Sequence, residues 1–473
     1  MTQAQTDMAM FLGILAVLSV VPWAVALRRA HAHGDWDRTS SLVFLTGVLA
    51  NLPTVAYVLH TGRPQRLDPL GEVVIGFPRW VHLMGLAANG LLLVVCGVFF
   101  LHRLLVGRAR VNTAPLVAMT LVVLVALSDG LRGQQLLVPR QIVLLAVLLA
   151  AAVARPGRPA LLGGAAVVML FTVLGGMEAL AEPRSVLREC RVDNPCGPLG
   201  VLYTGAFTNE NIFSLLLIVG LPFVWLGLRG PARTALTCYV AFMAVTTGSR
   251  LAGAAAVVAV VFLMVLRPRL PDEAGPRPRE SPAPGRILLG VPVLGAVAAA
   301  GLSMPFLRPE ADRLGDRSTI WEMATEELRD SPFIGFGAKA WSAKYQAGEI
   351  PAALSPSVHN QWIDVLYAGG LAGLALFLLL LIHLLVQGGV RGFPAASSVL
   401  LPVLLASVLE RPWSFGISNS LTFALLAAVL IPAAARSAAP EAAPGSSSSP
   451  AAEPVRTTPR LPAATAPGRS APR

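Results

Sequence analysis

The stretch 8–29, MAMFLGILAVLSVVPWAVALRR, decides the class of fold. It holds an uncharged run, Met8 to Leu27, and then two arginines. A helix of about 20 apolar residues crosses the roughly 30 Å hydrocarbon core of a bilayer. Positive residues collect at the cytoplasmic ends of such helices, and none precedes this run. We therefore expect a first membrane helix with its N-terminus outside, and not a cleaved signal peptide.

The rest of the chain repeats this pattern. Of its 473 residues, 55% are hydrophobic and only 13% are charged, whereas soluble proteins carry about 25% charged residues. The sequence predicts an all-α polytopic membrane protein with about 12–13 transmembrane helices. The expected spans are 8–27, 41–59, 81–101, 113–128, 137–154, 160–180, 208–228, 234–247, 251–266, 287–304, 363–386, 395–409 and 419–435.

The net charge of +11 could suggest a nucleic-acid partner. The arginines, however, cluster in short turns between apolar runs, which indicates a membrane protein with a positive cytoplasmic side and no nucleic acid. With alternating spans, one side receives 28–38, 102–110, 155–159, 229–233 and 267–286. The opposite, extracytoplasmic side receives 61–80, 181–207, 248–250 and the long loop 305–362.

The chain divides into three parts by composition. We expect N-terminal transmembrane helices over 1–180 and a transmembrane core over 181–435. Residues 436–473 are rich in Ala, Pro and Ser, which predicts a disordered cytoplasmic tail. The Pro-rich linker 267–286 should be disordered as well. The pair Cys190 and Cys196 falls in an outside loop, where either a disulfide or two free thiols are possible.

Two arginines on the outside face are candidates for chemistry. Arg250, in TTGSRLAG (246–253), lies in a turn between two apolar runs, where it either meets phosphates or is an ordinary interfacial arginine. Arg317 begins a short amphipathic helix in DRSTIWEMATEELRD (316–330). A guanidinium at a helix N-terminus can clamp a diphosphate, but it can also be a surface arginine that pairs with Asp316.

Two further stretches carry polar side chains at the same face. In SVHNQW (357–362), the His359 imidazole can accept a proton, and Asn360 can position it or bind a sugar hydroxyl. Trp362, like Trp341 before it, offers a flat face for a sugar ring or for the interface belt. A histidine at a helix start is also often a simple N-terminal hydrogen-bonding residue. The fourth stretch, GAFTNEN (205–211), holds Asn209 and Asn211 just before a span, where Thr208 or Asn209 could instead be a helix cap.

The order of these four stretches, each near an apolar span, resembles the O-antigen ligase and Wzy-type polymerase superfamily. The resemblance covers about residues 200–390. It implies a glycosyltransferase of the bacterial cytoplasmic membrane that works on the outer face. Such enzymes take a glycan from a polyprenyl-diphosphate lipid and transfer it to the hydroxyl of a glycan, lipid or protein acceptor.

By this resemblance, Arg250 and Arg317 hold the diphosphate and His359 deprotonates the acceptor hydroxyl. The family's GxG after a proline corresponds to Gly335 and Gly337. The asparagines of its earlier motif correspond to Asn209 and Asn211, which join Asn360 and Trp362 as expected substrate-binding residues.

One position departs from the family pattern. Several relatives carry an acidic residue nine positions after the histidine, where this chain has Ala368, and Asp364 lies one helical turn away. Glu410 and Arg411, at the outer end of a later span, could supply polar support. The outside loops contain no Asp-x-Asp motif. We therefore expect no cofactor and a transfer without a metal, in which arginines stabilise the leaving diphosphate.

Two other functions fit the same composition. A transporter or flippase of a lipid-linked or small anionic solute would have a similar number of spans, and AGGLAG (368–373) would allow close helix packing. Transporters, however, usually keep their polar groups near the membrane midplane, whereas here they line the outer interface. A membrane scaffold would leave the long polar outside loop unexplained. The donor sugar, the acceptor and the choice between ligation and polymerisation stay open.

Overall fold

The computed structural model describes residues 3–61, 77–106, 111–190, 197, 200–270, 284–307, 317–351, 354–355 and 357–431. Helices dominate these residues, and one two-stranded antiparallel sheet joins β1 (Leu187–Arg188) to β2 (Leu202–Tyr203). The long helices are α1 (Gln3–Ala32), α2 (Arg38–Thr61), α3 (Arg79–Leu105), α4 (Thr113–Leu131), α5 (Pro139–Ala152), α6 (Arg158–Ala181), α8 (Glu210–Gly227), α9 (Pro231–Thr246), α10 (Arg250–Leu266), α11 (Pro284–Ser303), α15 (Gln361–Val386) and α16 (Gly389–Ser407). The short ones are α7 (Pro183–Val186), η2 (Met304–Phe306), α13 (Arg317–Glu327), η3 (Leu328–Asp330), α14 (Ala340–Gln346) and α17 (Thr422–Val429).

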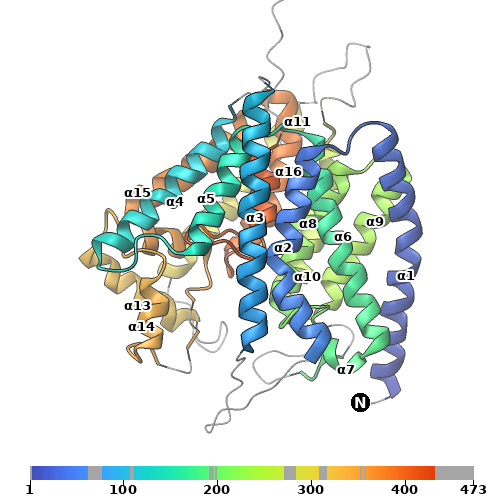
Figure 1. Cartoon of the computed structure of the whole chain (residues 1–473), viewed down its shortest axis with the longest axis horizontal. Coiled ribbons are helices and arrows are strands. Elements are labelled where there is room, and N and C mark those ends of the chain that lie inside the picture. The colour runs from blue at the N-terminus through green and yellow to red at the C-terminus, as the bar shows by residue number, and fades with distance from the viewer. Residues whose placement is uncertain are drawn as a thin grey trace, which may run out of the picture. The chain divides into compact units, whose positions relative to one another are not determined.

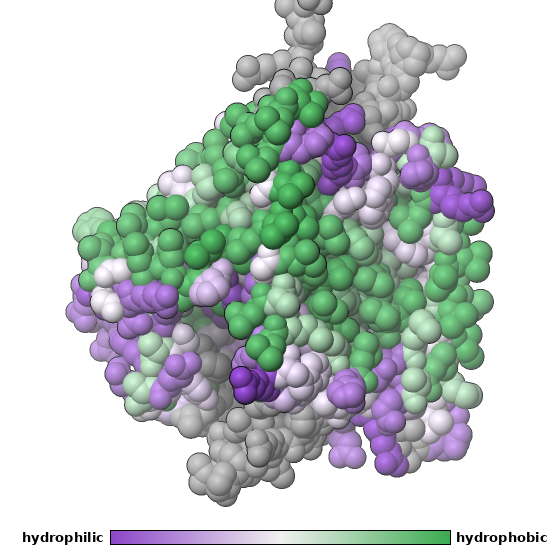
Figure 2. All heavy atoms as spheres, viewed as in Figure 1, coloured by the Kyte–Doolittle hydropathy of each residue, from purple (hydrophilic) through white to green (hydrophobic). Residues whose placement is uncertain are grey.

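The prediction of an all-α polytopic membrane protein is confirmed. Within the described residues, nine helices are long and apolar enough to cross a bilayer, and α5 and α10 are shorter apolar helices. Figure 2 shows the apolar surface as a broad band, with hydrophilic residues gathered toward its edges. Apolar side chains stay on the outside of such a bundle because they face lipid instead of water.

The helices form a central group and a peripheral group. The membrane segments of α6, α8 and α16 are 78%, 89% and 78% buried, whereas those of α1 and α3 are 28% and 22% buried. In Figure 1, α6 and α8 lie inside and α1 lies along one edge. Gly176 of α6 lets α1 approach closely, since a Cβ there would collide with Ala16. Small residues drive this kind of contact in membranes.

At one end of the bundle, here called the arginine-rich end, ion pairs connect three loops. Asp35 accepts two hydrogen bonds from Arg229, at 2.7 and 3.0 Å. Arg158 lies 4.0 Å from the same carboxylate. These residues come from three loops that the sequence places on one side, so their contact agrees with the predicted alternation of spans.

The opposite end, here called the loop end, carries residues 317–351, 354–355 and 357–360. This end points downward in Figure 1. The helices α7, α13 and α14 lie in the lower half of that view, as does the N-terminal end of the chain. The turn before α10 also belongs to this end, because the Tyr203 N–H of β2 donates to the Thr247 carbonyl at 3.2 Å.

Several sequence predictions fall on residues outside the described ranges. The tail 436–473 and most of the linker 267–286 are among them, although residues 284–286 belong to α11. Cys190 is disulfide-bonded, and Cys196, its expected partner, lies outside the described residues. Cys96 and Cys238 are free.

Helix α15 contains a break at Gly370, whose backbone has φ 61° and ψ −160°. Only glycine adopts this conformation readily. The segment 332–337 lies across the break and replaces the lost helical hydrogen bonds. Four bonds join the two segments: Phe336 N to Tyr367 O (2.8 Å), Gly337 N to Ala368 O (2.9 Å), Leu371 N to Pro332 O (2.8 Å) and Ala372 N to Phe333 O (3.1 Å). Irregular backbone near a membrane is tolerated when protein satisfies it in this way.

Candidate functional site

His359 lies at the loop end, directly before α15. Its backbone φ is +44°, a left-handed conformation that is uncommon for a residue with a side chain. The next residue, Asn360, caps the helix by accepting hydrogen bonds from the Trp362 and Ile363 amides, at 2.8 and 2.9 Å. The cap thus begins α15 immediately after the strained histidine and fixes where the imidazole stands.

The Glu410 carboxylate contacts both His359 and Arg317, which lie far from it in the sequence. Glu410 follows α16, and its Oε2 lies 3.0 Å from His359 Nδ1. Its Oε1 accepts a hydrogen bond at 2.6 Å from Nη2 of Arg317, the first residue of α13. The Glu410 side chain is 11% exposed, and the Arg317 and His359 side chains are each 27% exposed. The structure therefore brings together two of the three predicted catalytic residues and adds an acid between them.

The second imidazole nitrogen meets a hydroxyl. Ser355 Oγ lies 2.6 Å from His359 Nε2. Because a carboxylate only accepts hydrogen bonds, Glu410 favours the tautomer with the proton on Nδ1, which leaves Nε2 as the acceptor. Ser355 then donates to Nε2 and occupies the place where an incoming hydroxyl would deliver its proton.

This arrangement provides two chemical capabilities. The His359–Glu410 pair has the geometry of a general base whose orientation is set by a carboxylate, the relationship that activates hydroxyls in many transferases and hydrolases. Arg317 uses Nη2 for Glu410, while its partly exposed guanidinium has further N–H donors for an anion. The site could therefore accept the proton of a hydroxyl at His359 and bind a leaving phosphate at the neighbouring Arg317.

Arg250, the third predicted catalytic residue, heads α10 and is exposed. Within the described part of the chain, no hydrogen bond or ion pair connects it to Arg317, Glu410 or His359. It shares the loop end with them, because the turn that precedes it contacts β2. Its role in diphosphate binding stays a prediction.

Two of the predicted substrate-binding residues, Asn360 and Trp362, have structural roles in this fold. The Asn360 side chain is fully buried, and besides capping α15 it donates to the Gly301 and Val408 carbonyls, at 3.0 and 2.8 Å. Trp362 is 1% exposed and donates to Ser407 Oγ at 2.9 Å. Their burial favours roles in holding α11, α15 and α16 together over contact with substrate.

The two glycines of the GxG stretch permit close backbone contacts. Gly335 has φ +67°, and a Cβ there would lie 2.5 Å from the Tyr367 carbonyl oxygen. Gly337 has φ +87°, and a Cβ there would lie 2.7 Å from Asp129 Cα. Both glycines thus seat segment 332–337 against α4 and the break in α15.

The asparagines of the earlier motif stand at the start of α8. Asn209 caps this helix by accepting from the Ile212 amide at 2.9 Å, and Asn211 is half-buried. Between them, the buried carboxylate of Glu210 lies 3.4 Å from Arg188 Nη1 of β1. The capping interpretation of Asn209 therefore holds in the structure, and binding of substrate by Asn209 and Asn211 stays a prediction.

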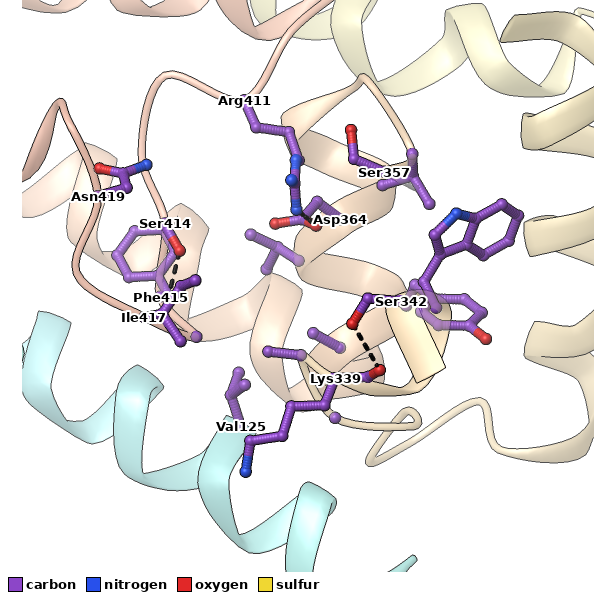
Figure 3. Close-up of a pocket in the computed structure, with 18 of the residues that line it drawn as sticks. Val125, Lys339, Ser342, Ser357, Asp364, Arg411, Ser414, Phe415, Ile417 and Asn419 are labelled. Atoms are coloured by element: carbon purple, nitrogen blue, oxygen red, sulfur yellow. Dashed lines mark hydrogen bonds and ion pairs between the residues drawn. The ribbon is translucent and has the colours of Figure 1, made fainter. Parts of the chain in front are cut away.

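A cavity of about 250 Å³ opens beside this group of residues. Figure 3 shows Arg411 pointing at Asp364, with Lys339 on the opposite wall. Arg411 Nη1 donates to Asp364 Oδ1 at 2.7 Å, and Lys339 Nζ lies 3.7 Å from the buried carboxylate of Asp129. Ser357, two residues before His359, also lines the cavity.

Sequence reasoning noticed some of the residues that complete the site and missed others. Ser355 and Lys339 gave no motif signal, although Lys339 is one of only two lysines in the chain. Glu410 and Arg411 were noticeable as charges next to an apolar span. The acid that the family resemblance led us to expect at residue 368 has no counterpart there, and the Ala368 backbone carbonyl accepts a hydrogen bond from the Gly337 amide.

Comparison with known proteins identifies part of the chain. Residues 235–378 match the family model described as O-antigen ligase. A comparison with curated proteins finds no match. The matched segment runs from α9 into α15, so it contains Arg250, Arg317 and His359 but neither Glu410 nor Arg411. Residues 235–378 are thus similar to the O-antigen ligase family, which supports the resemblance to the O-antigen ligase and Wzy-type polymerase superfamily that the sequence motifs indicated.

Proposed function

We propose that this protein is a membrane glycosyltransferase that ligates or polymerises polyprenyl-diphosphate-linked glycans on the outer face of the bacterial cytoplasmic membrane. The observation that carries the proposal is Glu410, which holds Arg317 and His359 on its two oxygens. The proposed core, residues 181–435, contains the whole matched segment, and residues 1–180 supply the N-terminal helices α1 to α6.

The reaction follows from the positions of these groups. His359 Nε2 takes the proton of an acceptor hydroxyl, while Glu410 stabilises the imidazolium that forms. The acceptor oxygen forms a bond to the anomeric carbon of the donor sugar, and the bond from that carbon to the diphosphate oxygen breaks. The departing diphosphate gains negative charge, which Arg317 stabilises. Arg250 is the proposed second diphosphate ligand. The arginines stand where a metal ion would otherwise act, so we propose transfer without metal.

Purified protein and a lipid-linked oligosaccharide test this proposal. We expect glycan transfer in the presence of EDTA. His359→Ala should keep donor binding and lose about 10²- to 10⁴-fold in turnover, the usual contribution of a general base. Arg317→Ala should weaken both donor binding and turnover. The matched controls are His33→Ala and Arg329→Ala, which change exposed residues without a place in the site.

Full turnover by His359→Ala would show that the base is assigned wrongly. Absence of transfer together with uptake of solute into liposomes would favour a transporter instead. In cells that lack the protein, labelled lipid-linked glycan would accumulate as single repeat units if it is a polymerase, and as long chains if it is a ligase.

A further inference from the structure

A second cavity, of about 350 Å³, lies at the arginine-rich end of the bundle, opposite to the loop end. It is formed where α8 ends, α9 begins and α10 ends, and its lining consists of Trp225, Arg233, Thr234, Met264, Arg267 and Arg269. Three of these residues are arginines, and this lining includes no aspartate or glutamate. A cavity with positive charge that its own walls do not compensate favours an anionic ligand.

Two of the arginines stand at the end of α10. Arg267 and Arg269 are both exposed, and Arg267 caps the helix in a left-handed conformation, with φ 43° and ψ 54°. Glycine is the usual residue at such a cap, because a side chain strains this conformation. The chain thus carries a guanidinium where the backbone alone favours glycine. Strain that is retained in this way indicates a role for the side chain.

The third arginine lies over an aromatic ring of the same cavity. Arg233 Cζ is 4.8 Å from the centroid of the Trp225 ring, a cation–π contact. Trp225 is 8% exposed, and its indole N–H has no hydrogen-bond acceptor within the described residues. Buried donors normally have an acceptor. An anionic oxygen bound beside the indole would supply the missing one.

The cavity adjoins an apolar face of α10. Met264, in the lining, is 47% exposed, and Val257, Val261 and Val265 are 58%, 54% and 50% exposed. Their spacing puts these four side chains on one face of the helix. Exposed apolar side chains on a membrane helix face acyl chains. A ligand with a phosphate and an acyl chain would therefore use both the arginines and this face, whereas a soluble anion would use only the arginines.

We infer that this cavity binds the phosphate headgroup of an anionic phospholipid, with an acyl chain along the exposed face of α10. Basic pockets between membrane helices bind anionic headgroups in this way. A free phosphate ion has the same charged oxygens, so the experiment includes both sources of phosphate. The lipid site stands apart from the proposed transfer reaction, because it shares no residue with the site at the loop end.

Native mass spectrometry of the full chain in a neutral detergent tests the inference. The probes are dioleoyl phosphatidylglycerol and dioleoyl phosphatidylcholine, which have the same acyl chains and a phosphate, although only the first has a net negative charge. We expect the dissociation constant of phosphatidylglycerol to be about tenfold lower than that of phosphatidylcholine. In a second arm, excess inorganic phosphate should not displace phosphatidylglycerol, because it cannot contact the apolar face.

Paired substitutions locate the binding. Arg267→Gly with Arg269→Gln removes two guanidinium groups, and the glycine also relieves the left-handed strain. This pair should lose the preference for phosphatidylglycerol, while its melting temperature without added lipid stays at or above that of the parent. The matched control is Arg28→Gln with Arg155→Gln, which removes two exposed arginines of the same end that do not line the cavity. The control should keep the preference.

Three results would overturn the inference: equal binding of the two phospholipids to the parent, displacement of phosphatidylglycerol by inorganic phosphate, or an unchanged preference in the folded Arg267→Gly, Arg269→Gln pair. Displacement would assign the arginines to a soluble anion. If the pair does not fold, Arg269→Gln alone decides the matter, since it changes an exposed residue beyond the end of α10. Its preference for phosphatidylglycerol should fall about fivefold, and an unaltered preference would reject the site.

Discussion

At the scale of single residues, Glu410 connects His359, the proposed base, with Arg317, the proposed diphosphate ligand. It lies 51 residues from His359 and 93 from Arg317 in the chain. Glu410→Gln keeps the size of the side chain, but its amide nitrogen can face the imidazole as a hydrogen-bond donor. The residue at 410 then no longer fixes the imidazole proton on Nδ1. We expect turnover to fall about 10²- to 10⁴-fold, as for loss of a correctly poised base, with donor binding changed much less.

The control for this prediction is Glu326→Gln, an exposed carboxylate of α13 at the same end of the molecule. Initial rates over a range of acceptor concentrations separate turnover from binding. Equal rates for Glu410→Gln and Glu326→Gln would mean that the acid has no part in catalysis and only braces α13.

Ser355 supports a different prediction. Its hydroxyl, 2.6 Å from His359 Nε2, competes with the acceptor hydroxyl for the same lone pair. Ser355→Ala should therefore retain turnover within about threefold and lower the KM for the acceptor, since an occupied nitrogen is freed. Steady-state kinetics with varied acceptor measure both values.

A loss of more than about 100-fold in Ser355→Ala would give the serine another role. It would then relay the proton between the acceptor and the imidazole, a general-base contribution of about this size. Ser303→Ala, an exposed change outside the site, is the matched control.

At this scale the sequence predicted residue types better than their partners. His359 and Arg317 were recognisable because ionisable groups near a membrane span are costly and rarely neutral to function. Glu410 could only be suspected, since nothing in local spacing predicts a contact across 93 residues. Asn360 and Trp362 were predicted to bind substrate, yet packing among three helices buries both.

At the scale of elements, the break in α15 determines where the loop end docks. Gly370→Ala would place a Cβ 2.5 Å from the Ile334 amide nitrogen and would force an unfavourable φ of +61°. Such a backbone conformation costs about 1–3 kcal/mol in a residue with a side chain, and the clash adds to it. We expect a lower melting temperature and faster proteolysis of the loop 317–360.

The matched control for Gly370→Ala is Gly97→Ala in α3. A Cβ at Gly97 meets nothing within 4 Å, and alanine favours a helix over glycine by about 1 kcal/mol. Melting of both variants in the same detergent, followed by limited proteolysis, measures the difference. A parental melting temperature in Gly370→Ala would mean that α15 accepts a continuous helix.

The sequence predicted the helices far better than this break. Apolar runs of 14 to 24 residues predicted each of the long helices, and the runs near 20 residues match the thickness of the hydrocarbon core. The pair Gly369–Gly370 was interpreted only as small residues for close packing. Its true conformation depends on segment 332–337, which supplies four backbone hydrogen bonds from more than 30 residues away, and no local pattern encodes such a partner.

At the scale of the whole molecule, the two ends of the bundle differ in chemistry. The arginine-rich end joins Asp35 to Arg229 and Arg158, and these residues come from loops that were predicted to be cytoplasmic. The loop end carries the disulfide-bonded Cys190, and disulfides persist outside the cytoplasm. Both features support the proposed orientation of the enzyme, with the site on the outer face.

Single cysteines test this orientation directly. In a background with Cys96→Ala and Cys238→Ser, Glu326→Cys lies exposed at the loop end and His33→Cys lies exposed at the arginine-rich end. A membrane-impermeant maleimide should label Glu326→Cys in cells with an intact cytoplasmic membrane, and His33→Cys only after that membrane is permeabilised. The reverse pattern would put Arg317 and His359 in the cytoplasm, where a lipid-linked glycan on the outer leaflet could not reach them, and would exclude transfer at the outer face.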